Sequence, residues 1–113
     1  MLPALTEPII VIRPAWTMQR GDRVANWKTA IEHEESDCMI RPVQGEETEV
    51  DGRRRSTVVT RWMLFAPLDA DITAHDRVRW SGAVYKIDAE PQPVTTHSPF
   101  LDHLETQFTK VEG

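Results

Sequence analysis

The sequence has few of the features that stabilise small secreted or membrane proteins. Its 113 residues include a single cysteine, Cys38, so no internal disulfide can form. This excludes the class of disulfide-stapled secreted domains. No apolar run approaches the roughly 20 residues of a membrane-spanning helix, and residues 1–8 lack the basic start and continuous apolar stretch of a secretory signal. We therefore expect synthesis in the cytoplasm of a host cell and no membrane partner.

Positive charge is also scarce. The chain has 13 Lys and Arg residues against 18 Asp and Glu residues, which gives a formal net charge of -5. A protein that holds nucleic acid mainly through phosphate contacts needs a basic face. The composition therefore argues against nucleic-acid binding as the main task, although an acidic protein can still lie beside DNA.

Motifs for metal binding and catalysis are missing as well. The four histidines and Cys38 do not have the paired spacing of metal ligands. The serines lack the context of a hydrolase nucleophile, and no glycine-rich loop could hold a phosphate. We therefore expect no metal, no cofactor, no catalytic residue and no enzymatic activity.

The sequence does contain apolar and polar residues that alternate with the period of a β-strand. The strongest case is residues 76–88, where apolar and charged side chains alternate on both sides of Ser81-Gly82. This pattern predicts a β-hairpin, because glycine supplies the positive φ that a tight hairpin turn requires.

Other segments also read as strands. They are residues 9–13, closed by Pro14, and residues 27–31, 38–43 and 57–65. Residues 68–75 are expected to form a connector with at most one helical turn. The residues after Pro91 fit either a helical stripe or strand alternation, and we favour a final strand.

Together these segments predict one domain of the all-β class. We expect a small antiparallel β-barrel or sandwich of about six to seven short strands joined by long loops. Residues 1–8 are assigned to an N-terminal extension and residues 9–113 to the single β-domain. Trp27, Trp62 and Trp80 occupy alternating positions that a core face would claim.

Two segments between the expected strands, residues 15–25 and 44–56, are longer than hairpin connections need. Such long loops in a small domain are usually functional or disordered. The candidate docking residues in the first loop are Trp16, Met18, Gln19, Arg20, Gly21, Asp22 and Arg23. The candidate residues in the second loop are Gln44, Gly45, Glu46, Glu47, Thr48, Glu49, Val50, Asp51, Gly52, Arg53, Arg54 and Arg55.

Several short motifs follow one another in an order that resembles a known family. They are Ile10-Val11-Ile12-Arg13-Pro14, the Gly21-Asp22-Arg23 loop, Trp27, Pro67, Asp71-Ile72, Asp76-Arg77-Val78, Gly82, Tyr85-Lys86-Ile87 and Pro91. This arrangement is similar to that of the stopper or head-closure proteins, which are head-tail connectors of long-tailed bacteriophages. The resemblance covers most of the chain from about residue 9 onward.

The resemblance implies a structural role in the neck of a virion, at the head-tail interface. Subunits of such proteins assemble head-to-tail into a ring, here a hexamer or dodecamer, that gates packaged double-stranded DNA without sequence-specific binding. The implied partners are further copies of the chain, the portal adaptor protein, and a tail terminator or tail-tube protein. By position, residues 44–56 would be the channel or plug loop, and residues 15–25 a partner-docking loop with Trp16 as its aromatic anchor.

The charge pattern of residues 44–56 has two interpretations. Its first half is acidic and its second half is basic, which would present opposite charges to the two neighbours in a ring. Mixed charge also simply keeps an exposed loop solvated, and exposed ion pairs contribute only about 0–1 kcal/mol each.

Two other functions remain open at this point. A monomeric OB-like module could bind oligonucleotides in a groove formed by Trp16, Trp62 and the cluster Arg53-Arg54-Arg55. The acidic net charge argues against that reading. A tail-terminator or minor tail protein would share the structural class and differ in its location in the virion.

Overall fold

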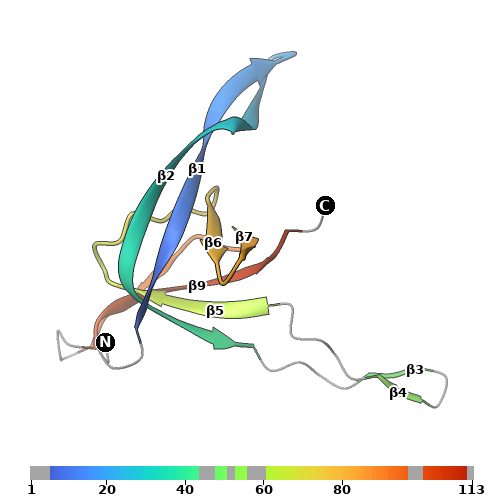
Figure 1. The fold of residues 1–113 in the computed structure, drawn as a ribbon, viewed down its shortest axis with the longest axis vertical. Coiled ribbons are helices and arrows are strands. Elements are labelled where there is room, and N and C mark those ends of the chain that lie inside the picture. The colour runs from blue at the N-terminus through green and yellow to red at the C-terminus, as the bar shows by residue number, and fades with distance from the viewer. Residues whose placement is uncertain (1–5, 44–47, 51–52, 56–60, 97–100, 112–113) are drawn as a thin grey trace.

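The structure, a computed structural model, describes residues 6–43, 48–50, 53–55, 61–96 and 101–111, and these residues form an all-β protein (Figure 1). The strands are β1 (Glu7–Gln19), β2 (Asp22–Pro42), β3 (Thr48–Val50), β4 (Arg53–Arg55), β5 (Arg61–Ala66), β6 (Arg77–Trp80), β7 (Ala83–Ile87), β8 (Gln92–Val94) and β9 (His103–Lys110). Every pairing between them is antiparallel. Within this part of the chain there is no helix long and apolar enough to cross a membrane. The expected fold class is confirmed.

The main sheet closes on itself. Its strands run in the order β5-β2-β1-β6-β7-β9-β8, and a further pairing joins β5 to β9. Phe65 of β5, for example, pairs with Met39 of β2 on one side and with Glu105 of β9 on the other. The strands β1, β2, β5, β9, β7 and β6 therefore form a closed circuit, with β8 added beside β9. The pairing is therefore ring-like within one sheet, rather than that of two separate packed sheets.

The core lies inside this circuit. Its buried apolar side chains come from β1, β2, β5, β6, β7, β9 and the β5–β6 connector, and they are Ile9, Val11, Cys38, Leu64, Ala66, Ile72, Val78, Tyr85, Ile87 and Phe108. Trp62 and Trp80 pack against them, with ring centroids 4.9 Å apart. Tyr85 and Phe108 meet edge to face at 4.8 Å. This geometry is favourable for aromatic rings, and the expected core positions of Trp62 and Trp80 are confirmed.

The β6–β7 hairpin is confirmed. Ser81 and Gly82 form its turn with φ values of 51° and 78°, and Trp80 pairs with Ala83 directly beside it. Positive φ at both central residues is the signature of a type I′ turn, whose twist matches that of the flanking strands.

The first strand is much longer than expected. The sequence predicted a stop at Pro14 and a loop over residues 15–25, but β1 continues to Gln19 and β2 begins at Asp22. The predicted loop is therefore wrong. Residues 15–26, hereafter the arm, are a two-stranded ribbon that projects beyond the closed sheet (Figure 1).

The β1–β2 ladder tolerates proline because its register shifts there. Shifts occur between Glu7 and Ile9 and between Arg13 and Ala15, so that Pro8 and Pro14 each lie within one. Proline has no N–H to donate, so it interrupts a ladder, but a bulge lets the strand continue beyond it.

The outcomes for the remaining expected strands differ. Residues 38–42 are not a separate strand but the end of β2, which changes partner from β1 to β5 at Met39, and Val43 lies beyond its end. Residues 57–60 of the expected fourth strand lie outside the described residues, and the rest of it forms β5. The final strand is confirmed as β9, whose Thr106 and Phe108 are buried.

The expected loop 44–56 contains a second, small sheet. Strands β3 and β4 pair with each other, from Thr48 with Arg55 to Val50 with Arg53. They form a two-stranded sheet separate from the main one, and Figure 1 shows it apart from the closed sheet.

Candidate functional site

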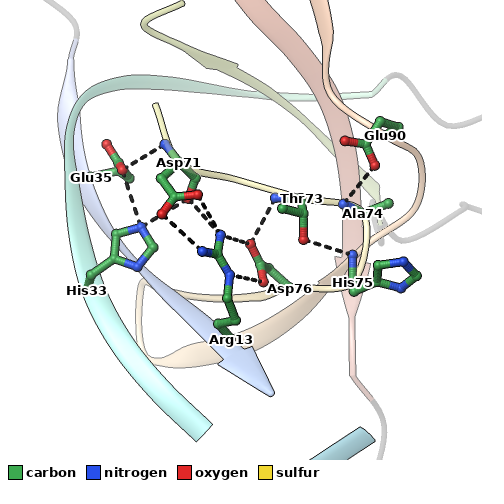
Figure 2. Close-up of polar contacts among 9 residues, drawn as sticks. All are labelled: Arg13, His33, Glu35, Asp71, Thr73, Ala74, His75, Asp76 and Glu90. Atoms are coloured by element: carbon green, nitrogen blue, oxygen red, sulfur yellow. Dashed lines mark hydrogen bonds and ion pairs between the residues drawn. The ribbon is translucent and has the colours of Figure 1, made fainter. Parts of the chain in front are cut away.

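A charged cluster fixes the base of the arm. Arg13 lies where β1 leaves the closed sheet, and its guanidinium donates to two carboxylates of the β5–β6 connector (Figure 2). Nε and Nη2 donate to Asp76 at 3.1 and 3.0 Å, while Nη1 and Nη2 donate to Asp71 at 3.0 and 2.8 Å. We call Arg13, Asp71 and Asp76 the Arg13 clasp. Its fork geometry joins β1 to a segment about sixty positions later in the chain.

Asp76 is the buried member of the clasp. Its side chain has no exposed surface. Besides Arg13, it accepts a hydrogen bond from the backbone N–H of Thr73 at 2.8 Å, and its own N–H donates to the Thr73 carbonyl. Its carbonyl accepts from the N–H of Ile87 on β7. A buried carboxylate needs such a full set of partners, and here the set holds the connector in one conformation.

Two members of the clasp, Arg13 and Asp71, keep their charges near neutral pH. The hydrogen bonds that Arg13 donates to Asp76 and Asp71 raise the pKa of Arg13 above its already high value, and the hydrogen bond from Arg13 lowers the pKa of Asp71. Groups with such pKa values do not exchange protons near neutral pH. The arrangement can therefore hold the arm and the connector together, which is a positioning role.

Strand β2 also contacts the β5–β6 connector, through His33 and Glu35. His33 Nε2 lies 3.0 Å from the Asp71 carbonyl oxygen and 3.2 Å from Glu35 Oε1. Glu35 Oε1 also accepts the backbone N–H of Asp71 at 2.9 Å. Both strands at the base of the arm thus contact Asp71 (Figure 2). Sequence reasoning missed this cluster, and the signal it could have used is a charged residue, Arg13, in an otherwise apolar strand.

The candidate docking residues are brought together at the end of the arm. Trp16 pairs with Ala25 and Met18 pairs with Arg23, so these four side chains share one face of the ribbon. Gln19 pairs with Asp22 across the turn of Arg20 and Gly21, which have φ values of 51° and 84°. All seven candidates therefore lie in one hairpin tip.

Trp16 is only partly available to a partner. It is 40% exposed, with the Arg23 guanidinium 4.5 Å from the centre of its ring and the ring of His75 at 5.3 Å. Met18 is more open, with 67% of its surface exposed. Its thioether side chain is well suited to an adaptable interface.

The candidate plug residues are only partly described. Thr48, Glu49 and Val50 lie in β3, and Arg53, Arg54 and Arg55 lie in β4, so a strand with one acidic residue is paired with the basic strand. The remaining candidates, Gln44, Gly45, Glu46, Glu47, Asp51 and Gly52, lie outside the described residues. Their role as a plug stays a prediction.

The expected core position of Trp27 is wrong. Arg13 pairs with Ile31 and Ala15 pairs with Asn26, so residues 27–30 of β2 bulge opposite the single residue Pro14. This bulge breaks the alternation on which the expectation depended. The ring of Trp27 lies under the Arg77 guanidinium at 3.9 Å, in a cation–π contact outside the core.

The described part of the chain has few groups that could bind a metal ion or act as a nucleophile. No cluster of three or more His, Cys, Asp or Glu residues there could hold a metal ion. Cys38 is fully buried, and this burial, with nearby carboxylates, raises the pKa of its thiol to about 12. The reactive thiolate form is therefore rare at neutral pH.

The fold raises the pKa of His103 on β9. Its Nδ1 lies 2.6 Å from the Leu101 carbonyl oxygen and its Nε2 lies 2.8 Å from Glu105 Oε1. Burial lowers the pKa of the ring, but the hydrogen bonds to Glu105 and Leu101 outweigh it, and the net pKa lies above the ordinary 6.5. Both nitrogens face acceptors, so the imidazolium is the form that satisfies both.

This raised pKa predicts a pH-dependent stability. The contribution of charged His103 is present in full below its unfolded pKa and is lost as the pH rises through the higher folded pKa. We expect wild type to have a larger free energy of unfolding than His103→Gln at mildly acidic pH, by less than about 1 kcal/mol because the pair is partly exposed, and therefore a higher Tm. The difference should disappear at alkaline pH. Glu105→Gln, which removes the partner, should weaken the same dependence, and a Tm difference constant across pH would contradict this assignment.

Comparison with known proteins yields a fold likeness. No family model matches the sequence, and no curated protein matches it either. The solved structure of the protein xkdH of the phage-like element PBSX from Bacillus subtilis is similar, with a TM-score of 0.50 and 17% sequence identity. The match covers 94% of this chain and 94% of that chain. The two proteins therefore share one fold over almost their whole length.

Proposed function

We propose that this chain is a structural protein of a long-tailed phage, a stopper or head-closure connector that forms a ring between the portal adaptor and the tail. The observation that carries the proposal is the fold shared with a protein of a phage-like element over 94% of both chains. The fold match supports a phage protein in general, and the order of sequence motifs, from Arg13-Pro14 to Tyr85-Lys86-Ile87, resembles the stopper or head-closure family.

The shape of the molecule supports an assembly role. A closed sheet supplies a rigid body, and two hairpins extend from it: the arm and the β3–β4 hairpin (Figure 1). In a ring, the β3–β4 hairpin would point into the channel and obstruct packaged DNA, while the arm would contact a neighbour. Such work depends on shape and interfaces, and no chemical step is needed.

The oligonucleotide-binding alternative receives less support from the geometry. It needs Trp62 and Trp16 as open stacking platforms. Trp62 packs against the core and Trp80, and the ring of Trp16 already contacts Arg23 and His75. A tail-terminator or minor tail role uses the same kind of assembly and is separated from the neck role by the phenotype below.

Removing the gene from a phage that encodes this chain tests the proposal. We expect the mutant to accumulate heads that have packaged DNA and lost it, together with complete, unattached tails, as seen by electron microscopy. A tail-terminator role would instead give tails of abnormal length. Normal infectious particles in the mutant would contradict both roles.

Complementation of that mutant assigns the plug. Wild-type protein should restore infectious particles. The triple variant Arg53→Glu, Arg54→Glu, Arg55→Glu reverses the basic strand of the β3–β4 hairpin, and we expect at least a tenfold lower yield of DNA-filled particles. The matched reversal Lys86→Glu, on an exposed position of β7, should complement normally. Equal yields from both variants would remove the hairpin from the mechanism.

A further inference from the structure

The end of the arm is exposed, basic and partly apolar. Arg20 and Arg23 flank the single acid Asp22, and Met18 is 67% exposed beside them. Arg20 sits at the first central position of the turn with φ 51°, where asparagine or glycine is conformationally preferred. An arginine held there at a conformational cost suggests that its charge is used.

A groove of the opposite charge lies on another wall of the sheet. It has a volume of about 450 Å³ and is lined by residues of β5, β9 and the segment between β7 and β8. Its acidic members are Asp88, Glu90 and Glu105, against one base, Arg61. Met63 contributes apolar surface to the same lining. The groove thus offers negative charge and an apolar contact, which are the complements of the arm tip.

Each of the three carboxylates has a hydrogen-bond partner for one of its two oxygens among the described residues. Asp88 Oδ1 accepts from the Thr109 hydroxyl, and Glu90 Oε2 accepts from the Ala74 backbone N–H. Glu105 Oε1 is the oxygen that meets His103. The second oxygen of each carboxylate has no partner in this part of the chain, so each can accept from an incoming guanidinium.

The arm and the groove lie on different sides of the molecule. In the six-strand circuit, β9 is three strands away from β1 in either direction. The arm extends β1 and β2 away from β5 and β9 (Figure 1). A projecting element and its complement on different sides of one subunit cannot meet within that subunit. A contact between them would join two subunits head to tail, and such a heterologous contact closes into a ring when the rotation per subunit allows.

We propose that the occupant of this groove is the arm tip of a second copy of this chain. The inference rests on the ring of the proposed function and names the contact that builds it. Arg20 and Arg23 meet Asp88, Glu90 and Glu105, and Met18 meets Met63. One such hairpin tip buries less than a standard interface of about 800 Å² per partner, so a single contact is weak and ring closure strengthens it.

Site-directed crosslinking tests the contact on the full-length chain. Gln19→Cys places a thiol at the arm tip and Gln92→Cys places one at the groove, and both replace exposed neutral residues. With a short bis-maleimide, the 1:1 mixture of the two single variants should give a covalent dimer. Each variant alone should give at least tenfold less dimer, because a heterologous contact never brings two identical sites together. The native Cys38 is buried and stays silent.

Charge reversal supplies an independent measurement by sedimentation. Arg20→Glu and Glu90→Lys should each weaken self-association by about tenfold, which is roughly 1.4 kcal/mol. Combining both substitutions in one chain should restore it, since the pair is re-formed with exchanged signs. Glu34→Lys, at an exposed position of β2 that pairs with Ile10 of β1, lies outside the arm tip and the groove lining and should leave self-association unchanged.

Two results would overturn the proposed contact. One is crosslinking of wild-type copies by a lysine-reactive reagent without any dimer from the mixed cysteine variants, which would place the interface elsewhere. The other is the absence of joined copies with either reagent at the highest concentration reached. Neither result bears on the gene-removal phenotype, so failure of this contact and failure of the proposed function are distinguishable.

Discussion

Replacing Asp76 with alanine is expected to lower the free energy of unfolding by about 3 kcal/mol, since two donors lose their acceptor when a buried carboxylate is removed. The side chain of Asp76 is fully buried and accepts from Arg13 twice and from Thr73 N–H once. Its loss leaves Arg13 Nε and the Thr73 N–H without this acceptor, while Arg13 Nη1 and Nη2 still donate to Asp71. Chemical denaturation followed by tryptophan fluorescence measures the effect.

Asp71 is the matched control, because it binds the same guanidinium. Its side chain is 61% exposed, against none for Asp76. Water can replace an exposed carboxylate, so Asp71→Ala should cost less than about 1 kcal/mol. Equal losses for the two variants would show that burial does not set the strength of the Arg13 clasp. The low pKa of Asp71 adds a small contribution that is lost as the pH falls through that pKa.

Truncating Phe108 to alanine is expected to cost about 4 kcal/mol, because the change removes a buried ring and leaves a cavity. Phe108 is fully buried, and its ring meets those of Tyr85 and Trp80. In the β9 ladder it pairs with Trp62 on β5 and with Ile87 on β7. The residue therefore stands where β9 closes the sheet. A fall in Tm of roughly 15–25 °C should follow for a domain of this size.

Leu101→Ala is the control for Phe108. It also removes a large apolar side chain, but Leu101 is 52% exposed, so the loss should stay within about 0.5 kcal/mol. Phe108→Leu should fall between the two because it keeps most of the buried volume. A Tm for Phe108→Ala within a few degrees of wild type would show that sheet closure does not depend on this aromatic cluster.

The elements that were predictable from the sequence are those whose signal is local. The β6–β7 hairpin needs only alternation and a turn that Gly82 can adopt. The final strand β9 follows from alternation at Thr106 and Phe108, which a helix would not bury on one face. Trp62 and Trp80 pack against the core for the same reason.

The elements that were not predictable depend on pairing between distant residues. Proline normally ends a strand, but Pro14 falls at a register shift, so β1 continues into the arm. The bulge opposite Pro14 also moved Trp27 out of the core. The Arg13 clasp joins residues far apart in the chain, and one sequence cannot show which acids Arg13 will meet. The seven docking candidates lie together in one hairpin, in a strand ribbon rather than the expected loop, and their docking role stays a prediction.

The arm is held at its base by contacts with the closed sheet and its connector. The Arg13 clasp and the contacts of His33 and Glu35 fix the base of the arm against the closed sheet. An arm held at a defined angle can present Arg20 and Arg23 in one orientation to a neighbour. A flexible arm would pay an ordering cost at each contact of the ring. Through the buried Asp76, the Arg13 clasp therefore connects the stability of the fold to the proposed assembly.

The most direct measurement is a cryo-electron microscopy reconstruction of the neck in phage particles that contain this chain. We predict a ring of this fold between the portal adaptor and the tail, with each arm tip in the neighbouring subunit's groove and the β3–β4 hairpins pointing toward the channel. A neck without this fold, in particles that do contain the chain, would contradict the proposed role as a neck connector.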